Sequence, residues 1–238
     1  MRDPSMLILM VALTVGFLIW RRYSARLAAE RRRQLESWAT ARGWRYRPAD
    51  AALAHRWNGP PFTGGGQTSD VFSGDLDGRS FTAFQYSYEE GSGDNSVTRH
   101  FLVTAVRLPA PLPMLWIAPE TAFGRLARRI GSQDIDFESA EFNRTFVVRA
   151  DDERYAHAMI HPRMMEYLLR SPAREHSLRI EGDTLLMWQP GTMTTDRLLV
   201  ATGTLTHLAD LIPSHALDQH AIAPSPPPPD GRRAMPAR

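Results

Sequence analysis

The hydrophobic pattern of the chain begins with one long apolar segment. Residues Met6 to Trp20 carry no charged side chain, and as a helix they would span about 22 Å. This is somewhat less than a hydrocarbon core of about 30 Å, but flanking residues can extend the span. The pattern predicts a transmembrane helix over residues 5–22. The absence of polar positions argues against a buried core helix. The bulky Trp20 and the arginines after it argue against a cleaved signal peptide.

Arginines follow the apolar segment at once, whereas only Arg2 precedes it. The positive-inside rule therefore predicts a single-pass protein of the cell membrane, with its N-terminus outside and its C-terminal domain in the cytoplasm. The arginines act as a topology signal, as ligands for anionic lipid headgroups, or as both. The side chains expected at the membrane interface are Trp20, Arg21, Arg22, Tyr23, Arg26, Arg31, Arg32 and Arg33.

The arginine-rich juxtamembrane segment, residues 23–47, continues as a helix out of the membrane. Gly43 is expected to end this helix, and residues 44–47 to follow as a short extended piece before Pro48.

Alternating apolar and polar positions then predict strands. Residues 71–76 and 79–88 flank Asp77-Gly78, the pair favoured in a type I′ hairpin turn. In the second of these strands Phe84, Tyr86 and Tyr88 share one face. We expect this face to belong to the core, with a surface that stacks on a ligand as the alternative.

The remaining patterns predict one cytoplasmic domain over residues 48–213. Further strands are expected at 96–108, 115–118 and 146–149, and a second hairpin at 178–188 around Gly182-Asp183. Helical periodicity predicts helices at 123–130, 151–161, 162–170 and 195–212. The fold class is therefore α+β, with mostly antiparallel strands and a long C-terminal helix; a PH-like barrel plus a helix is the alternative. The apolar stripe of the last helix either packs on the sheet or dimerises. Residues 214–238, which are rich in proline, predict a disordered tail.

Composition removes several classes of chemistry. The chain has no cysteine, and all 28 basic residues are arginine. Thiolate metal sites, phosphate loops with the G-x-x-x-x-G-K-[ST] pattern and Schiff-base chemistry are therefore excluded. No cofactor is expected. Nucleic acid is not expected as a partner either, because the arginines lie next to the membrane segment without an aromatic-basic platform.

Weak metal candidates remain at His157 and His161. They are four residues apart, a spacing that places both side chains on one face of a helix. The glutamate of an H-E-x-x-H site is absent, so two ordinary surface or capping histidines are favoured. Asp134, Asp136 and Glu138 form an acidic segment that lacks the spacing of a calcium loop and is expected to be an exposed loop.

Parts of the sequence resemble small single-pass membrane proteins of unknown function from actinobacteria. The segments that carry the likeness are ARGWRY (41–46), GPPF (59–62), FTAFQYSYEE (81–90) and the stretch 142–169. This last stretch resembles the domain of unknown function DUF3137, in which a strand, an aspartate and two helices recur. The likeness covers much of residues 35–190. It implies a structural module and brings no activity, cofactor or catalytic residue.

Three functions are consistent with these observations. The sequence favours a non-enzymatic, membrane-tethered module that binds a protein partner or the membrane surface. A membrane-anchored hydrolase or metal-assisted enzyme would use the two histidines and the acidic segment. A small-ligand or lipid-binding domain would use the face of Phe84, Tyr86 and Tyr88.

Overall fold

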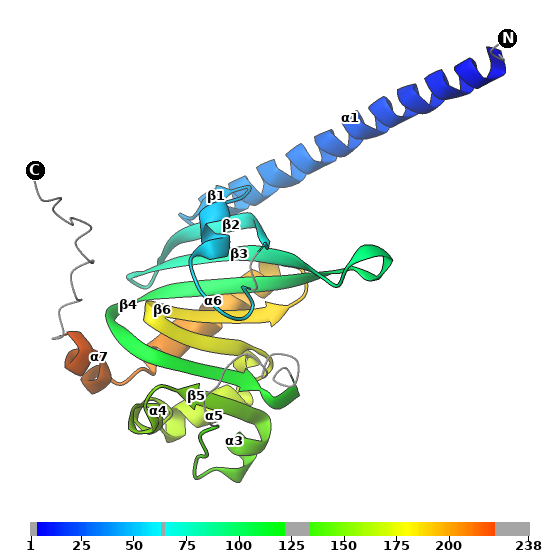
Figure 1. The fold of residues 1–238 in the computed structure, drawn as a ribbon. Helices are drawn as coiled ribbons and strands as arrows, with labels where there is room; N and C mark the ends of the chain where they lie inside the picture. Colours follow the sequence, from blue (N-terminus) through cyan, green and yellow to red (C-terminus); the bar gives the residue numbers. More distant parts are fainter. Residues whose placement is uncertain (1–3, 63–64, 122–133, 222–238) are drawn as a thin grey trace, which may run out of the picture.

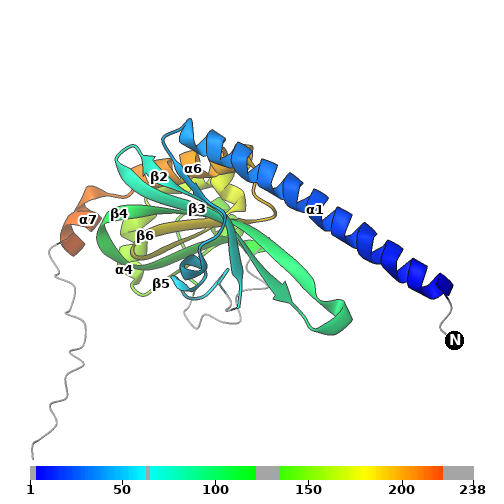
Figure 2. The ribbon, with the colours of Figure 1, turned by 90° about the horizontal axis from the view of Figure 1, so that it is seen from above.

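The computed structural model describes residues 4–62, 65–121 and 134–221. The first element, α1 (Pro4–Thr40), is a single helix whose N-terminal part projects far from the rest of the molecule (Figures 1 and 2). Among the described residues, no helix is both long enough and apolar enough to cross a membrane. As predicted, Gly43 follows the end of α1 with a φ of +71°, and the chain then enters β1 (Arg45–Arg47). A left-handed glycine of this kind is a common way to end a helix.

The domain is built on a six-stranded antiparallel sheet with strands of different lengths. After β1 come β2 (Gln67–Leu76), β3 (Arg79–Glu90), β4 (Val97–Pro119), β5 (Phe146–Ala150) and β6 (Ser177–Pro190). The strand order is β1-β2-β3-β4-β5, and β6 pairs with β4. Asp77 and Gly78 both have positive φ, at 52° and 82°, which confirms the predicted β2–β3 hairpin. Because β1 pairs only with β2 and β5 only with β4 in the described chain, the sheet does not close into a barrel.

The prediction of separate strands at 96–108 and 115–118 is wrong, because both belong to β4. This strand turns back on itself (Figure 1). Its first part pairs with β3 and β6, and its last part with β5 and β6. Pro109, Pro111 and Pro113 lie between these ladders, at positions without a paired partner. A proline has no backbone N–H to donate, so it is tolerated at such a place.

The second predicted hairpin is also wrong. Residues 178–180 and 184–188 lie in the single strand β6, and both parts pair with β4. Gly182 has a φ of +57° where the register with β4 shifts. The glycine therefore bends one strand at an irregularity and does not connect two strands of a hairpin.

Helices cover one face of the sheet. They are α3 (Ala140–Thr145), α4 (Glu153–Met159), α5 (Pro162–Arg170), α6 (Thr195–Asp210) and α7 (Ser214–Ala221). The apolar stripe of α6, including Leu198, Leu205 and Leu208, is buried in the main core, so it packs within the domain and does not remain free for a partner helix.

The α+β class is confirmed. The prediction of a disordered tail is wrong for residues 214–221, since they form α7 and Ala216 is buried. Residues 222–238, and the helix predicted at 123–130, lie outside the described residues.

A second core lies on the opposite face of the sheet, under the loop between β1 and β2. This loop contains the short 3₁₀ helix η1 (Ala51–His55). Trp57 and Phe62 from the loop pack against Phe84 and Tyr86 of β3. Phe84 and Tyr86 are fully buried and Tyr88 is partly buried, so the face they share belongs to the core.

Candidate functional site

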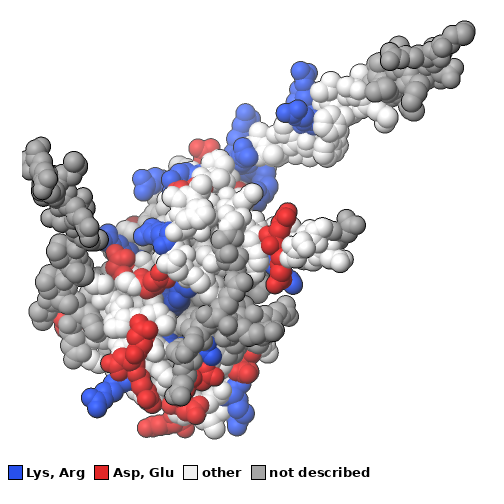
Figure 3. Space-filling view, viewed as in Figure 1, with Lys and Arg blue, Asp and Glu red and all other residues white. Residues whose placement is uncertain are grey.

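The part of α1 outside the domain carries both exposed apolar side chains and arginines. Phe17, Leu18 and Ile19 are exposed, and Trp20 is 63% exposed. Basic side chains follow along the helix toward the domain (Figure 3). The arginines on this part of α1 are Arg21, Arg22, Arg26, Arg31, Arg32 and Arg33. An apolar surface of this kind next to a cationic one suits the boundary between a hydrocarbon layer and charged headgroups.

One of these arginines, Arg31, also forms an ion pair with the domain. The guanidinium of Arg31 donates from Nη2 to Oδ2 of Asp70 on β2, at 2.8 Å. The hydroxyl of Tyr46 on β1 donates to Oδ1 of the same carboxylate, at 2.7 Å. Asp70 thus joins α1, β1 and β2 at the edge of the domain. We call Arg31, Tyr46 and Asp70 the junction triad.

The local backbone explains why the Asp70 side chain lies in this position. The ladder between β2 and β3 shifts register between Ser69 and Phe72, and Asp70 lies in this irregularity with a φ of +48°. Its N–H donates to the carbonyl of Pro48 at 2.9 Å. Aspartate is one of the few residues with a side chain that occupies the left-handed region at small cost.

The contacts of the junction triad raise the pKa values of its two donors, Tyr46 and Arg31. Burial raises the pKa of the Tyr46 hydroxyl well above its usual value, and the hydrogen bond to Asp70 raises it further. The hydrogen bond to Asp70 raises the pKa of Arg31. Both donors are protonated at physiological pH in any case, and both shifts favour the protonated form further.

Aromatic packing holds the last turns of α1 beside the triad. Trp38 makes edge-on contacts with Trp44 and with Phe72, at centroid distances of 5.6 and 5.7 Å. Ala39 is fully buried and Leu35 is partly buried against the main core. The C-terminal end of α1 is therefore part of the domain, whereas residues 13–30 are exposed apart from the partly buried Ser24.

The two histidines do not form the predicted pair on one helix face. Helix α4 ends at Met159, so His157 lies on α4 while His161 is the N-cap of α5. The Nε2 of His161 lies 2.9 Å from the carbonyl oxygen of Leu211 and must donate to it. Its Nδ1 accepts from the N–H of Met164. Both ring nitrogens of His161 are thus engaged, and His157 instead packs on Phe137 and lies 3.8 Å from Glu153. In the described part of the chain, no three histidine or acidic side chains are grouped to hold a metal ion.

The acidic segment is an exposed loop whose first carboxylate has a structural partner. Oδ1 of Asp134 accepts from Nε of Arg149 at 2.9 Å, and the Arg149 side chain is almost completely buried. Asp134 therefore neutralises a buried cation on β5.

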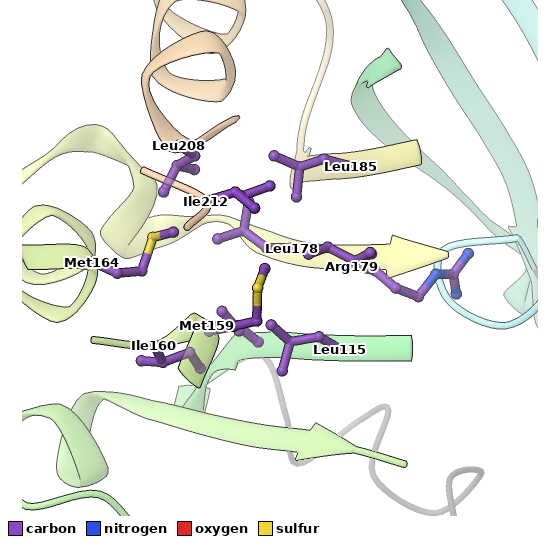
Figure 4. A pocket seen from close by; sticks show the side chains of 11 residues that line it. Leu115, Met159, Ile160, Met164, Leu178, Arg179, Leu185, Leu208 and Ile212 are labelled. Carbon is purple, nitrogen blue, oxygen red and sulfur yellow. The ribbon is translucent and has the colours of Figure 1, made fainter. Parts of the chain in front are cut away.

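A small apolar cavity lies between the sheet and the helices. Its volume is about 30 Å³, enough for a water-sized molecule or two. Leu115, Met159, Leu178 and Leu208 are among the side chains that line it, and the Arg179 guanidinium points away from it (Figure 4). This cavity is far smaller than the several hundred Å³ of an ordinary ligand pocket.

One solved structure is similar to this chain in fold. No protein-family model matches the sequence, and no curated protein matches it. The crystal structure of the mycobacterial trehalose monomycolate transport factor A, TtfA, is similar, with a TM-score of 0.60. The similarity covers 82% of this chain and 97% of that one, at 16% sequence identity. At this identity the likeness shows the fold, and the resemblance to DUF3137 stays a prediction.

Sequence reasoning missed Asp70 and Tyr46. The only local signal was a carboxylate next to the apolar pair Val71-Phe72 in a predicted strand region, which does not indicate its partner. The partner Arg31 is 39 residues away along the chain.

Proposed function

We propose that this chain is a non-enzymatic accessory module tethered to the membrane, with a domain that binds a protein partner. The observation that carries the proposal is α1, one helix that runs from an apolar segment through a row of arginines into the core of the domain. In this proposal residues 6–20 lie in the bilayer, and the domain lies in the cytoplasm.

The arginines that remain free of the domain would contact anionic lipid headgroups. Arg31 is bonded to Asp70, so the groups available for lipid are Arg21, Arg22, Arg26, Arg32 and Arg33. Each arginine near an anionic surface contributes about 1 kcal/mol, and added salt weakens the contribution. Trp20 and Tyr23 would lie at the interface, where aromatic side chains are enriched.

An accessory role is supported by the fold and by the character of the interior. The structurally similar TtfA is named as a transport factor, and by analogy we propose that this domain serves a membrane process through protein contacts. Some of the residues named for the two alternative functions have structural roles. Phe84 and Tyr86 are buried in a core, and His161 has both ring nitrogens engaged.

Membrane extraction tests the tether. The full chain should stay with membranes at alkaline pH, and a Leu13→Arg, Phe17→Arg double variant should be released, because charge in the apolar segment opposes insertion. The matched control is Leu199→Arg, Val200→Arg, which adds the same charges at exposed apolar positions of α6. Release of the parent chain at alkaline pH would refute the tether.

A reporter at the C-terminus tests the orientation. One that is active only in the cytoplasm should be active on the parent chain. An Arg21→Gln, Arg22→Gln, Arg26→Gln variant should lose part of this activity, since it lacks charge that fixes the topology. Activity of a reporter that works only outside the cell would overturn the proposed localisation.

A further inference from the structure

We propose that Asp70 is a latch that fixes the direction in which α1 leaves the domain, so that α1 acts as a rigid lever. The latch is a property of the folded chain alone. Its consequence at the membrane rests on the proposed function, because only a tethered α1 would transmit its direction to the bilayer.

The contacts of α1 with the domain divide into two zones. Leu35, Trp38 and Ala39 pack against the core and fix where α1 is attached. About one helical turn further toward the N-terminus, Arg31 bonds to Asp70 at the outer edge of the domain. With only one zone of contact, α1 could rotate about that zone relative to the domain. The second contact, about one helical turn away, prevents this rotation.

Asp70 is suited to hold this second point firmly. Its side chain is 12% exposed, and it accepts charge-assisted or phenolic hydrogen bonds from two other elements. Loss of Arg31 would leave a nearly buried carboxylate with one side-chain donor, which is unfavourable. The Arg31 side chain, by contrast, is 57% exposed. Arg31 can therefore leave Asp70 and move into solvent without any change in the core.

Because the part of α1 outside the domain is long, a small change at the contact between Arg31 and Asp70 would displace its far end by several Å. From Leu35, about which α1 would pivot, to Trp20 the helix rises about 22 Å. A change of about 20° in the direction of α1 would therefore displace Trp20 by about 8 Å. With the latch closed, the domain would be held at one orientation relative to the apolar segment. With it open, the domain would swing about the pivot at Leu35.

Distances between paired spin labels test the latch directly. The chain has no cysteine, so cysteines introduced at Ala25 on α1 and Ser80 on β3, both exposed, give one defined pair of nitroxides. The measurement is the width of the distance distribution in the full chain in detergent micelles. The test variants are Arg31→Gln and an Arg31→Gln, Tyr46→Phe double variant. The matched control is Arg33→Gln, which removes the same charge from an exposed position of the same helix.

The expected result is a distribution at least twice as wide in Arg31→Gln, wider still in the double variant, and unchanged in Arg33→Gln. A distribution in Arg31→Gln as narrow as in the parent would overturn the proposal. Arg31 is largely exposed, so this variant is expected to keep the fold, and circular dichroism verifies that it does. The result is independent of membrane extraction: a chain released at alkaline pH but with a widened Arg31→Gln distribution would refute the tether and support the latch.

Discussion

Gly66 lies directly against the ring of Tyr86, so close that a Cβ at position 66 would overlap the Tyr86 hydroxyl. Tyr86 is fully buried, and its ring contacts Phe62 and Tyr88. The loop that covers the second core therefore depends on a glycine at this position. Close approach of backbone to an aromatic ring is one of the few roles only glycine fills.

Gly66→Ala should destabilise the domain by about 1–3 kcal/mol, the usual range for an overpacked core. The measurement is the free energy of unfolding by denaturant titration. Gly203→Ala is the matched control, because nothing lies within 4 Å of the added Cβ on α6. That change should stabilise the domain by about 1 kcal/mol, since alanine is the better helix former. Equal effects of the two substitutions would contradict the packing described for Tyr86.

Gln85 should be a second sensitive position, for a different reason. Its buried amide Nε2 donates to the carbonyl of Phe101 at 2.9 Å, and its Oε1 accepts from the N–H of Met193. The side chain thus connects the sheet to the loop before α6. Gln85→Leu keeps the size but leaves both backbone groups without this partner, and should cost about 1–3 kcal/mol. Denaturant unfolding would measure this loss, and a change below about 0.5 kcal/mol would show that water or nearby groups replace the amide.

The features that could be predicted from sequence are those set by neighbouring residues. Asp77-Gly78 specifies its hairpin because both residues tolerate positive φ. Gly43 likewise marks the end of α1. The alternation of Phe84 and Tyr86 placed both on one face, and their burial followed from their apolar character.

The features that could not be predicted depend on distant partners. Pro109 and Gly182 are ordinary turn signals, yet they lie within β4 and β6 because each strand pairs with the other on both sides of the irregularity. Trp57 and Phe62 belong to the second core although residues 58–66 are rich in glycine and proline, a composition typical of turns and not of core segments. The bond between Arg31 and Asp70 depends on a bulge for which no local sequence pattern is specific.

His176 should make stability depend on pH. Burial lowers the pKa of His176 below its ordinary value of 6.5, although its Nδ1 donates to the carbonyl of Pro172. Above pH 6.5 the ring is neutral in both states, and its full contribution to stability is present. As the pH falls below 6.5 the unfolded chain binds a proton that the folded chain does not, so stability falls until the lower, folded-state pKa is reached.

The measurement is the free energy of unfolding between pH 7.5 and 5. The parent should lose up to about 1.4 kcal/mol per pH unit more than His176→Gln over the window below pH 6.5. His55→Gln, a change at an exposed histidine, is the control and should keep the slope of the parent. Identical slopes in the parent and in His176→Gln would show that His176 is protonated as readily in the folded state as in the unfolded one.

His161 should act as a cap and not as a metal ligand. Its Nδ1 accepts from Met164 at the start of α5, while its Nε2 ties that start to the end of α6 through Leu211. His161→Ala removes both interactions and should cost about 0.5–2 kcal/mol, the usual range for an N-cap. His157→Ala, at a position that is nearly half exposed, should cost less. Thermal unfolding with added Zn²⁺ and with a chelator distinguishes cap from ligand: the cost of His161→Ala should be the same in both. A midpoint that rises with Zn²⁺ in the parent, and no longer rises in either variant, would establish the histidines as a metal site after all.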